Sequence, residues 1–331
     1  MITAGIAAAA WFVLALPGLS RLPVSPMLLA IVAGLLLAPV ARQHATWEPG
    51  LALARGVVLK TSVVLVGLGI GLSELGSLGV MALPLVLLAV VIGLSFTLVL
   101  ARAFGASQPL AALLAAGTAI CGVSAIAAAA PAVAARHQDV AYALACIALF
   151  GLMATLVYPL ALGALIEAPE IVGLVLGAVI HDTAQVSAAA SLLEQSGHGI
   201  GSLDAAMVSK LLRNACLLGA IPLLAWLSRG SAPSNSLRPP PLPLFIVFFL
   251  LMAAARSAGD VWLGPDHPAW ASLIDASRPI TQFGFAMAMA ALALALRPGE
   301  LRQAGLKPAL AALIATLAMV IIISAVALLL Y

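Results

Sequence analysis

Long apolar stretches follow one another along the whole chain, and short polar segments that often contain proline or glycine separate them. A helix that crosses a bilayer needs about 20 consecutive, predominantly apolar residues. Windows that approach this requirement lie at residues 3–19, 24–41, 51–73, 79–101, 108–135, 140–164, 170–194, 203–228, 242–258, 278–296 and 308–330. We therefore predict an all-α polytopic membrane protein of about 10–11 transmembrane helices, built as a single transmembrane domain over residues 1–331. Only residues 259–277 are expected to form a long connection.

The composition agrees with a membrane environment. Hydrophobic residues make up 64% of the 331 residues and charged residues only 8%, whereas ordinary soluble domains carry about 25% charged residues. So few charges cannot cover a soluble surface, and disorder is excluded because it needs many charges and few apolar residues. The basic residues form no cluster typical of nucleic-acid binding, and the three cysteines lack the spacing of a metal site. We expect no cofactor, metal ion or nucleic acid.

Two of the windows contain interruptions at mid-membrane depth. Residues 108–135 hold the string GTAICGVS at 117–124, and residues 170–194 hold HDTAQ at 181–185. Glycine weakens a helix, and Asp and Thr are favoured at helix N-caps, so we predict that both helices break and restart there. Broken helices are tolerated at membrane depth where they line a cavity, and transporters use them to build a site near the midplane. Whether the two segments cross the membrane or re-enter is open at this point.

A weak internal similarity connects residues 66–84 with residues 290–308. Each stretch contains a leucine followed four positions later by glycine and then by a proline, Leu75, Gly79 and Pro84 in the first stretch. Transporter folds commonly contain inverted repeats. The similarity would fit inverted repeats with approximate halves at residues 1–165 and 166–331, but it does not establish them by itself.

The basic residues divide unequally when successive connections are assigned to alternate sides. One side collects Arg42, Arg55, Arg102, Arg229, Arg238, Arg297, Arg302 and Lys307, and the other collects Arg21, Arg136, Arg256 and Arg278. Cytoplasmic loops carry an excess of Lys and Arg, so the first side and the N-terminus are expected to be cytoplasmic. We expect a multi-pass protein of the bacterial inner membrane.

The polar run at 181–185 is the strongest candidate for a functional site. An Asp at the bilayer centre costs about 2.5–3.5 kcal/mol on insertion scales, so Asp182 needs a partner or a function. One hypothesis is a proton or ion relay formed with His181, which Thr183 and Gln185 would accompany in the site. The alternative is structural, with Asp182 accepting backbone N–H bonds as the cap of the restarted helix.

A second candidate is cationic. Lys210, Arg213 and Asn214 are spaced by three and four residues and share one face of a helix. They are expected either to bind an anionic substrate or to pair with Asp182, because a guanidinium donates two parallel hydrogen bonds to an oxyanion. The alternatives are a purely structural ion pair, or a Lys210 side chain that snorkels to the interface.

The break at 117–124 offers geometry instead of charge. Backbone N–H groups near Gly122 and Ser124 would present the positive end of a helix dipole to an anion. Thr118 and Ser124 could add hydroxyl groups, and Cys121 is expected beside them as a small apolar residue. The alternative is close helix packing by small residues.

Four further charged residues receive simpler interpretations. Arg55 and Lys60, at the start of the third window, are expected to snorkel toward the interface. Glu194 and Asp204 flank a short connection and are expected to be solvated.

Three of these segments resemble a known family. The strings at 117–131 and 181–186 and the Lys210–Asn214 segment are similar to the YeiH family of candidate sulfate exporters, and the similarity covers nearly the whole chain. That family is distantly related to the bile acid/sodium symporter and cation/proton antiporter superfamily. The resemblance implies an inner-membrane secondary transporter with two inverted repeats and helices broken near the midplane. It does not identify the substrate.

These observations predict a secondary active transporter of a small inorganic or organic anion, with sulfate or a related sulfur oxyanion as the leading candidate. It would work by alternating access and couple to H⁺ or Na⁺. The chain contains no GxxxxGK[ST] motif of an ATP-driven pump. An anion channel is the alternative, and an intramembrane enzyme is a weaker one because no GxSxG or HExxH motif is present. The anion, the coupling ion, the direction of transport and the existence of a homodimer are left open.

Overall fold

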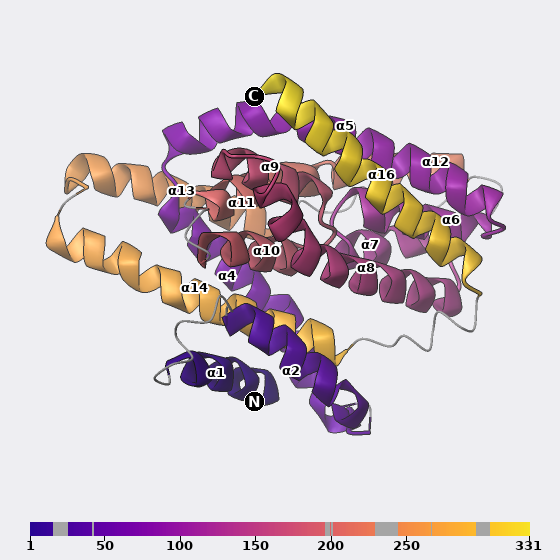
Figure 1. Cartoon of the computed structure of the whole chain (residues 1–331), viewed down its shortest axis with the longest axis horizontal. Coiled ribbons are helices and arrows are strands. Elements are labelled where there is room, and N and C mark those ends of the chain that lie inside the picture. Colours follow the sequence, from indigo (N-terminus) through magenta and orange to yellow (C-terminus); the bar gives the residue numbers. More distant parts are fainter. Residues whose placement is uncertain are drawn as a thin grey trace.

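The computed structural model describes residues 1–15, 26–41, 43–195, 199, 201–228, 244–265, 267–295 and 305–331, and within these ranges it contains helices and turns but no strand. Figure 1 shows the arrangement. The helices are α1 (Ile2–Ala15), α2 (Pro26–Ala41), α3 (Glu48–Leu53), α4 (Leu59–Val66), α5 (Leu72–Ala103), α6 (Gln108–Ala119), α7 (Val123–Ala132), α8 (His137–Gly163), α9 (Pro169–Val179), α10 (Thr183–Gln195), α11 (Ser202–Ala215), α12 (Leu217–Leu227), α13 (Leu244–Trp262), α14 (Pro268–Leu294) and α16 (Lys307–Leu330). The predicted all-α architecture is confirmed.

Each predicted apolar window coincides with a helix or with a pair of shorter helices. Within the described ranges, six helical segments are long and apolar enough to cross a bilayer: Glu48–Gly69, Leu72–Ala103, His137–Gly163, Ser202–Leu227, Leu244–Trp262 and Lys307–Leu330. The first of these, here called the α3–α4 rod, joins α3 and α4 through a π-helical turn at Ala54–Val58 and ends in a 3-10 turn at Gly67–Gly69. The protein is therefore a polytopic membrane protein.

The long connection predicted for residues 259–277 is wrong. α13 ends at Trp262 and α14 already begins at Pro268, so only a tight turn joins them. Asp260 and Asp275 of this segment lie on α13 and α14, and Arg256 and the Trp270 indole N–H both donate to Asp260 at 2.8 Å. Helices α13 and α14 continue beyond their apolar windows because these polar side chains satisfy one another.

The segment α6–α7 is a re-entrant hairpin, called hairpin 1. Tyr331 at the end of α16 donates to the Met81 carbonyl near the start of α5 at 2.6 Å, so these two long helices are antiparallel. Tyr142, near the start of α8, contacts the beginning of α16 by donating to the Gly305 carbonyl and accepting from the Ala309 N–H. The end of α5 and the start of α8 therefore lie at the same end of the molecule (Figure 1). Hairpin 1 connects them through the short segments 104–107 and 133–136 and must enter and leave on one side.

The segment α9–α10 is a second re-entrant hairpin, called hairpin 2. Ser202, at the start of α11, donates to the Ala190 carbonyl of α10 at 3.2 Å. The same residue packs so closely on Gly173 of α9 that a Cβ there would collide with the Ser202 carbonyl. In one continuous helix, residues 173 and 190 would lie about 25 Å apart at 1.5 Å per residue. Hairpin 2 therefore folds back on itself, and Leu193 near its end returns to Gly163 at the end of α8.

The two hairpins enter from opposite ends and meet at their tips. A Cβ on Gly122 would lie 3.4 Å from the His181 carbonyl oxygen, so the two tips are in contact. Both predicted breaks are thus present, between Ala119 and Val123 and between Val179 and Thr183. Entry from opposite ends is typical of inverted-repeat transporters. The halves 1–165 and 166–331 stay a prediction, and residues 296–304 of the second similar stretch lie outside the described residues.

Candidate functional site

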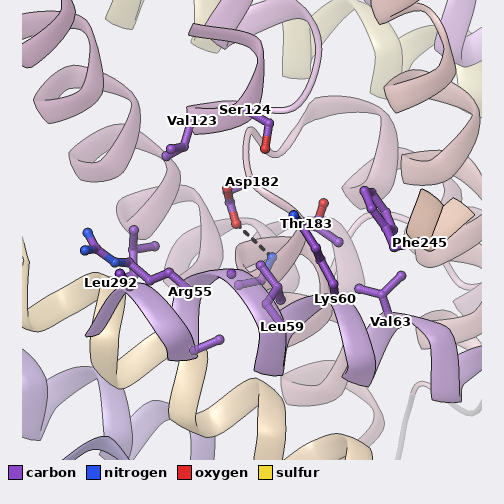
Figure 2. Close-up of a pocket in the computed structure, with 14 residues that line it drawn as sticks. Arg55, Leu59, Lys60, Val63, Val123, Ser124, Asp182, Thr183, Phe245 and Leu292 are labelled. Carbon is purple, nitrogen blue, oxygen red and sulfur yellow. Dashed lines mark hydrogen bonds between the residues drawn. The ribbon is translucent and has the colours of Figure 1, made fainter. Parts of the chain in front are cut away.

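A cavity of about 370 Å³ lies where the hairpin tips face the α3–α4 rod (Figure 2). Polar and charged side chains contribute to one part of its wall, and they are Arg55, Lys60, Ser124, Asp182 and Thr183. Small and apolar residues form the rest, namely Ala52, Gly56, Leu59, Val63, Val123, Ala184, Phe245, Ala288 and Leu292. The cavity therefore combines both hairpin tips with the rod, α13 and α14.

The tip of hairpin 2 is a capped helix N-terminus. The Asp182 carboxylate accepts the Ala184 N–H at 2.9 Å, and the Asp182 N–H donates to the Gln185 side-chain oxygen at 3.1 Å. This reciprocal arrangement resembles a capping box, with the Asp182 side chain bound to the second and not the third residue of α10, and it explains why α10 restarts at Thr183. The predicted structural role of Asp182 is confirmed. Its second carboxylate oxygen makes no hydrogen bond within the described part of the chain, and Asp182 also lines the cavity.

The tip of hairpin 1 presents a second helix N-terminus to the same cavity. Gly122 precedes α7 with φ +63°, a conformation that L side chains rarely adopt, so the chain can reverse there. No side chain caps α7, and the first N–H groups of a helix have no partner inside it. Val123 and Ser124, the first two residues of α7, both line the cavity, and Ser124 is exposed to it.

The opposite faces of the tips carry helix C-termini, and two buried cations bind them. Lys210 donates to the carbonyl oxygens of Ile120 and Ile180 at 2.8 Å each and also to that of His181. Three acceptors use all three N–H donors of an ammonium group. Because Ile120 belongs to hairpin 1 and the other two residues to hairpin 2, Lys210 fastens the tips together.

Arg213, about one helical turn further along α11, also binds carbonyl groups of both hairpin tips. It donates to the carbonyls of Ala119 and Ile180 at 2.7 and 2.8 Å, and to that of Thr118. Both Lys210 and Arg213 are fully buried, and neither lines the cavity. This geometry favours a structural role over the predicted contact with an anion. Neither cation forms an ion pair with Asp182 within the described residues.

The tips are consequently polarised. The N-termini of α7 and α10 face the cavity, whereas the C-termini of α6 and α9 face away and their carbonyl groups accept hydrogen bonds from Lys210 and Arg213. A helix N-terminus carries about half a positive charge, and its N–H groups form a ready anion site. The arrangement makes the cavity side of the tips electropositive.

Lys60 adds a full positive charge to this side. In Figure 2 its side chain extends from the rod toward Thr183 and Asp182. Among the described residues it makes no hydrogen bond or ion pair. Arg55 also lines the cavity, but it pairs with Glu48 at 2.6 Å and donates to the Leu51 carbonyl at 3.3 Å. Both residues therefore line a cavity at the hairpin tips. The prediction that they snorkel toward the interface did not include this cavity.

The sequence contained a signal for these two residues, because both lie inside an apolar window. A charged residue at such a position indicates a candidate functional site. Arg55 and Gly56 also lie in the π-helical turn of the rod. Such single turns occur frequently at functional sites and cannot be identified from hydropathy.

The remaining predicted site residues lie behind the cavity wall. Thr118, Cys121, Gly122, His181, Gln185 and Asn214 are buried and do not line the cavity. Gln185 spans from the Asp182 N–H to the Ala148 carbonyl, and Asn214 donates to the Thr183 hydroxyl at 3.5 Å. They form a second layer that holds the hairpin tips in position.

His181 is held by α16. Thr316 donates its hydroxyl proton to the Ala312 carbonyl at 2.9 Å, so it accepts from His181 Nε2 at 3.1 Å. This pattern assigns the imidazole proton to Nε2. His181 Nδ1 is buried without a hydrogen-bond partner in the described structure.

Glu194 and Asp204, predicted to be solvated, are partly buried beside a second cavity of about 590 Å³. The Glu194 carboxylate accepts the Leu203 N–H at 3.0 Å and thereby closes the connection between hairpin 2 and α11. This cavity lies further along the rod, beside Leu65 and Gly69. Its carboxylates include Glu74, and Arg278 is on its wall.

The fold and the site define a polytopic α-helical membrane protein with a polar cavity at the tips of two re-entrant hairpins. The chain belongs to the family described as Conserved hypothetical protein 698, whose model matches residues 1–312. The predicted family resemblance is thus confirmed.

Curated relatives carry names that describe location only. A UPF0324 membrane protein of Streptococcus pneumoniae is 32% identical over 268 residues, covering 80% of this chain and 78% of the relative. A UPF0324 membrane protein of Pseudomonas aeruginosa is 31% identical over 303 residues, with 87% and 81% covered. The UPF0324 inner membrane protein YeiH of Escherichia coli is 29% identical over 313 residues, with 90% and 84% covered. No solved structure matches the chain.

Proposed function

We propose that this protein is a secondary active transporter of a small anion, which binds in the cavity at the hairpin tips. One observation carries the proposal: two helix N-termini converge on one cavity with Lys60, which has no partner within the described ranges, while the helix C-termini point away from it. Each N-terminus contributes about half a positive charge. Ser124 and Thr183 add hydroxyl groups that can donate to an anion.

Alternating access needs a site that each side of the membrane can reach in turn. Two hairpins that enter from opposite ends and meet at their tips place such a site between the two sides. Lys210 and Arg213 hold these tips through carbonyl oxygens of both hairpins, so the tips can move as one unit with α11. A rigid unit that carries the site between two positions agrees with the repeat-against-repeat motion of known transporters.

Asp182 is the candidate for coupling to protons. Among the described residues that line the cavity it is the only carboxylic acid, and one of its oxygens has no partner in the same part of the chain. Protonation would remove a negative charge beside the bound anion. Anion binding would then become stronger as the pH falls, which couples the anion to a proton.

The re-entrant hairpins also affect the proposed orientation. Because hairpin 1 returns to the side from which it entered, Arg136 joins the more basic side and widens the charge asymmetry. The N-terminus stays on that side, which we propose to be the cytoplasm. Other residues used in the assignment, Arg21, Arg42, Arg229, Arg238, Arg297 and Arg302, lie outside the described residues.

Solid-supported membrane electrophysiology of the reconstituted protein tests this function. A panel of anions is applied at two pH values, with and without Na⁺, and liposomes without protein are the control. We expect anion-dependent currents that saturate and increase with the proton gradient. Currents that scale linearly with anion concentration and show no dependence on either cation gradient would indicate a channel. Absence of any anion response would refute the proposal.

A further inference from the structure

We propose that the anion carried by this protein is a small organic monoanion, with one anionic group on a short apolar stem, and not a bare inorganic dianion such as sulfate. The inference depends on the proposed function, because it names the substrate class of the same cavity. Three properties of the cavity support it: the division of its wall, its charge and its size.

The wall is divided into a polar and an apolar part. Lys60, Ser124 and Thr183 surround the position where an anionic group would lie, beside the hairpin tips. Figure 2 shows Val63 and Phe245 together beyond Lys60, and both line the same cavity. The oxygens of a bare oxyanion that face this apolar wall find no protein donor there, so that part of the cavity stays filled with water and its apolar surface is not buried. A ligand with one polar end and one apolar end satisfies both parts.

The charge of the cavity suits a single negative charge. Arg55 is neutralised by Glu48 at 2.6 Å, so Lys60 is the cation left without a partner in the described wall. Ionised Asp182 offsets this charge. The two helix N-termini together supply about one positive charge, which balances one anionic group. This match to a single negative charge applies to ionised Asp182. With Asp182 protonated the wall gains about one further positive charge, and the division of the wall and its volume then carry the preference over sulfate.

The volume exceeds what a bare oxyanion requires. At about 30 Å³ for each water in the liquid, 370 Å³ corresponds to about twelve waters. Sulfate has only five heavy atoms and would leave more than half of this space to water. Pockets for organic ligands start at about 300 Å³ and are lined mainly by apolar side chains, and the present cavity has both properties.

The test compares methanesulfonate and propane-1-sulfonate, acetate and butyrate, and inorganic sulfate on the full-length protein. Binding is measured by thermal stabilisation in detergent and transport by currents on a solid-supported membrane. Each buried methylene contributes about 0.8 kcal/mol, or about fourfold in affinity. We therefore expect propane-1-sulfonate to bind at least tenfold more tightly than methanesulfonate, with a parallel gain from acetate to butyrate. Sulfate should bind more weakly than propane-1-sulfonate.

A matched pair of variants locates the effect. Phe245→Ala should reduce the gain from methanesulfonate to propane-1-sulfonate to less than threefold. Phe248→Ala on the same helix should leave the gain unchanged, because Phe248 is 51% exposed and does not line the cavity. A preference for sulfonates over carboxylates, or the reverse, would identify the anionic group within the same substrate class.

Two outcomes would overturn the inference, and they can be distinguished. If sulfate produces saturable, proton-dependent currents and binds as tightly as propane-1-sulfonate, the transporter function stands and the organic-anion inference is wrong. If no anion stabilises the protein or produces a current, the proposed function itself fails. A gain with chain length that persists in Phe245→Ala would also contradict the placement of the apolar stem.

Discussion

Replacement of Arg213 by methionine should lower the free energy of unfolding, because it weakens the contact between the two hairpins. It should not weaken anion binding directly. Arg213 donates to carbonyls of Thr118, Ala119 and Ile180 from a fully buried position. Methionine fills a similar volume with a flexible side chain but donates no hydrogen bond. Ile180 keeps a donor, because Lys210 also binds its carbonyl oxygen.

The expected cost follows from the two carbonyls that lose their donor. Hydrogen bonds to charged groups contribute about 1.5–3 kcal/mol each, so Thr118 and Ala119 together account for about 3–6 kcal/mol. The variant no longer buries a guanidinium, which offsets part of this loss. We expect a net loss near the lower end of that range, about 3 kcal/mol.

Thermal unfolding in detergent, followed by tryptophan fluorescence, measures this effect. Arg102→Met is the matched control, because Arg102 is exposed and makes one hydrogen bond of 3.2 Å to the Ala106 carbonyl at a helix end. Arg213→Met should unfold well below wild type and Arg102→Met close to it. A variant that unfolds like wild type but no longer responds to anions would refute the structural role of Arg213 and return it to the binding site.

Three further substitutions separate binding, coupling and backbone geometry. Lys60→Met should lower the apparent anion affinity at least tenfold in electrophysiology without lowering the unfolding temperature, whereas Lys307→Met at the exposed start of α16 should change neither. Asp182→Asn keeps a good N-cap but cannot titrate, so anion affinity should stay high as the pH rises where that of wild type falls; an unchanged pH profile would exclude Asp182 as the coupling group. Gly122→Ala should cost about 1–3 kcal/mol because φ is +63°, and Gly76→Ala, which meets no atom within 4 Å, should be neutral or stabilising in the same unfolding assay.

Hydropathy predicted the apolar parts of the helices but not the start of α14, which lies inside the connection expected at residues 259–277. Apolar windows depend only on local composition, and each coincides with a helix or helix pair. The breaks were also predictable, because Asp182 and Gly122 have local capping and turn preferences. Re-entry was not, since an apolar segment of about 25 residues can either cross the bilayer or fold back. What decides between the two is the contact of Ser202 with both Gly173 and Ala190, which is tertiary.

The candidate site shows the same division between local and tertiary information. The shared helix face of Lys210 and Arg213, and the ability of a guanidinium to bind an oxyanion, suggested that both residues touch the substrate. In the structure, Lys210 and Arg213 instead donate their hydrogen bonds to the backbone carbonyl groups that the two helix breaks expose. Among the described residues that line the cavity, the cation without a partner is Lys60, which reaches the hairpin tips from a distant segment of the chain. Sequence identifies which polar groups are buried, but the identity of their partners depends on packing.

The position of the bound anion tests the proposed site most directly. A structure determined with 3-bromopropane-1-sulfonate would locate the bromine by anomalous scattering and the sulfonate by its density. We predict the sulfonate between Lys60 and the N-termini of α7 and α10, with the bromine against Phe245 and Val63. A sulfonate bound to Lys210 or Arg213, or in the cavity beside Glu194 and Asp204, would contradict the assignment of the site.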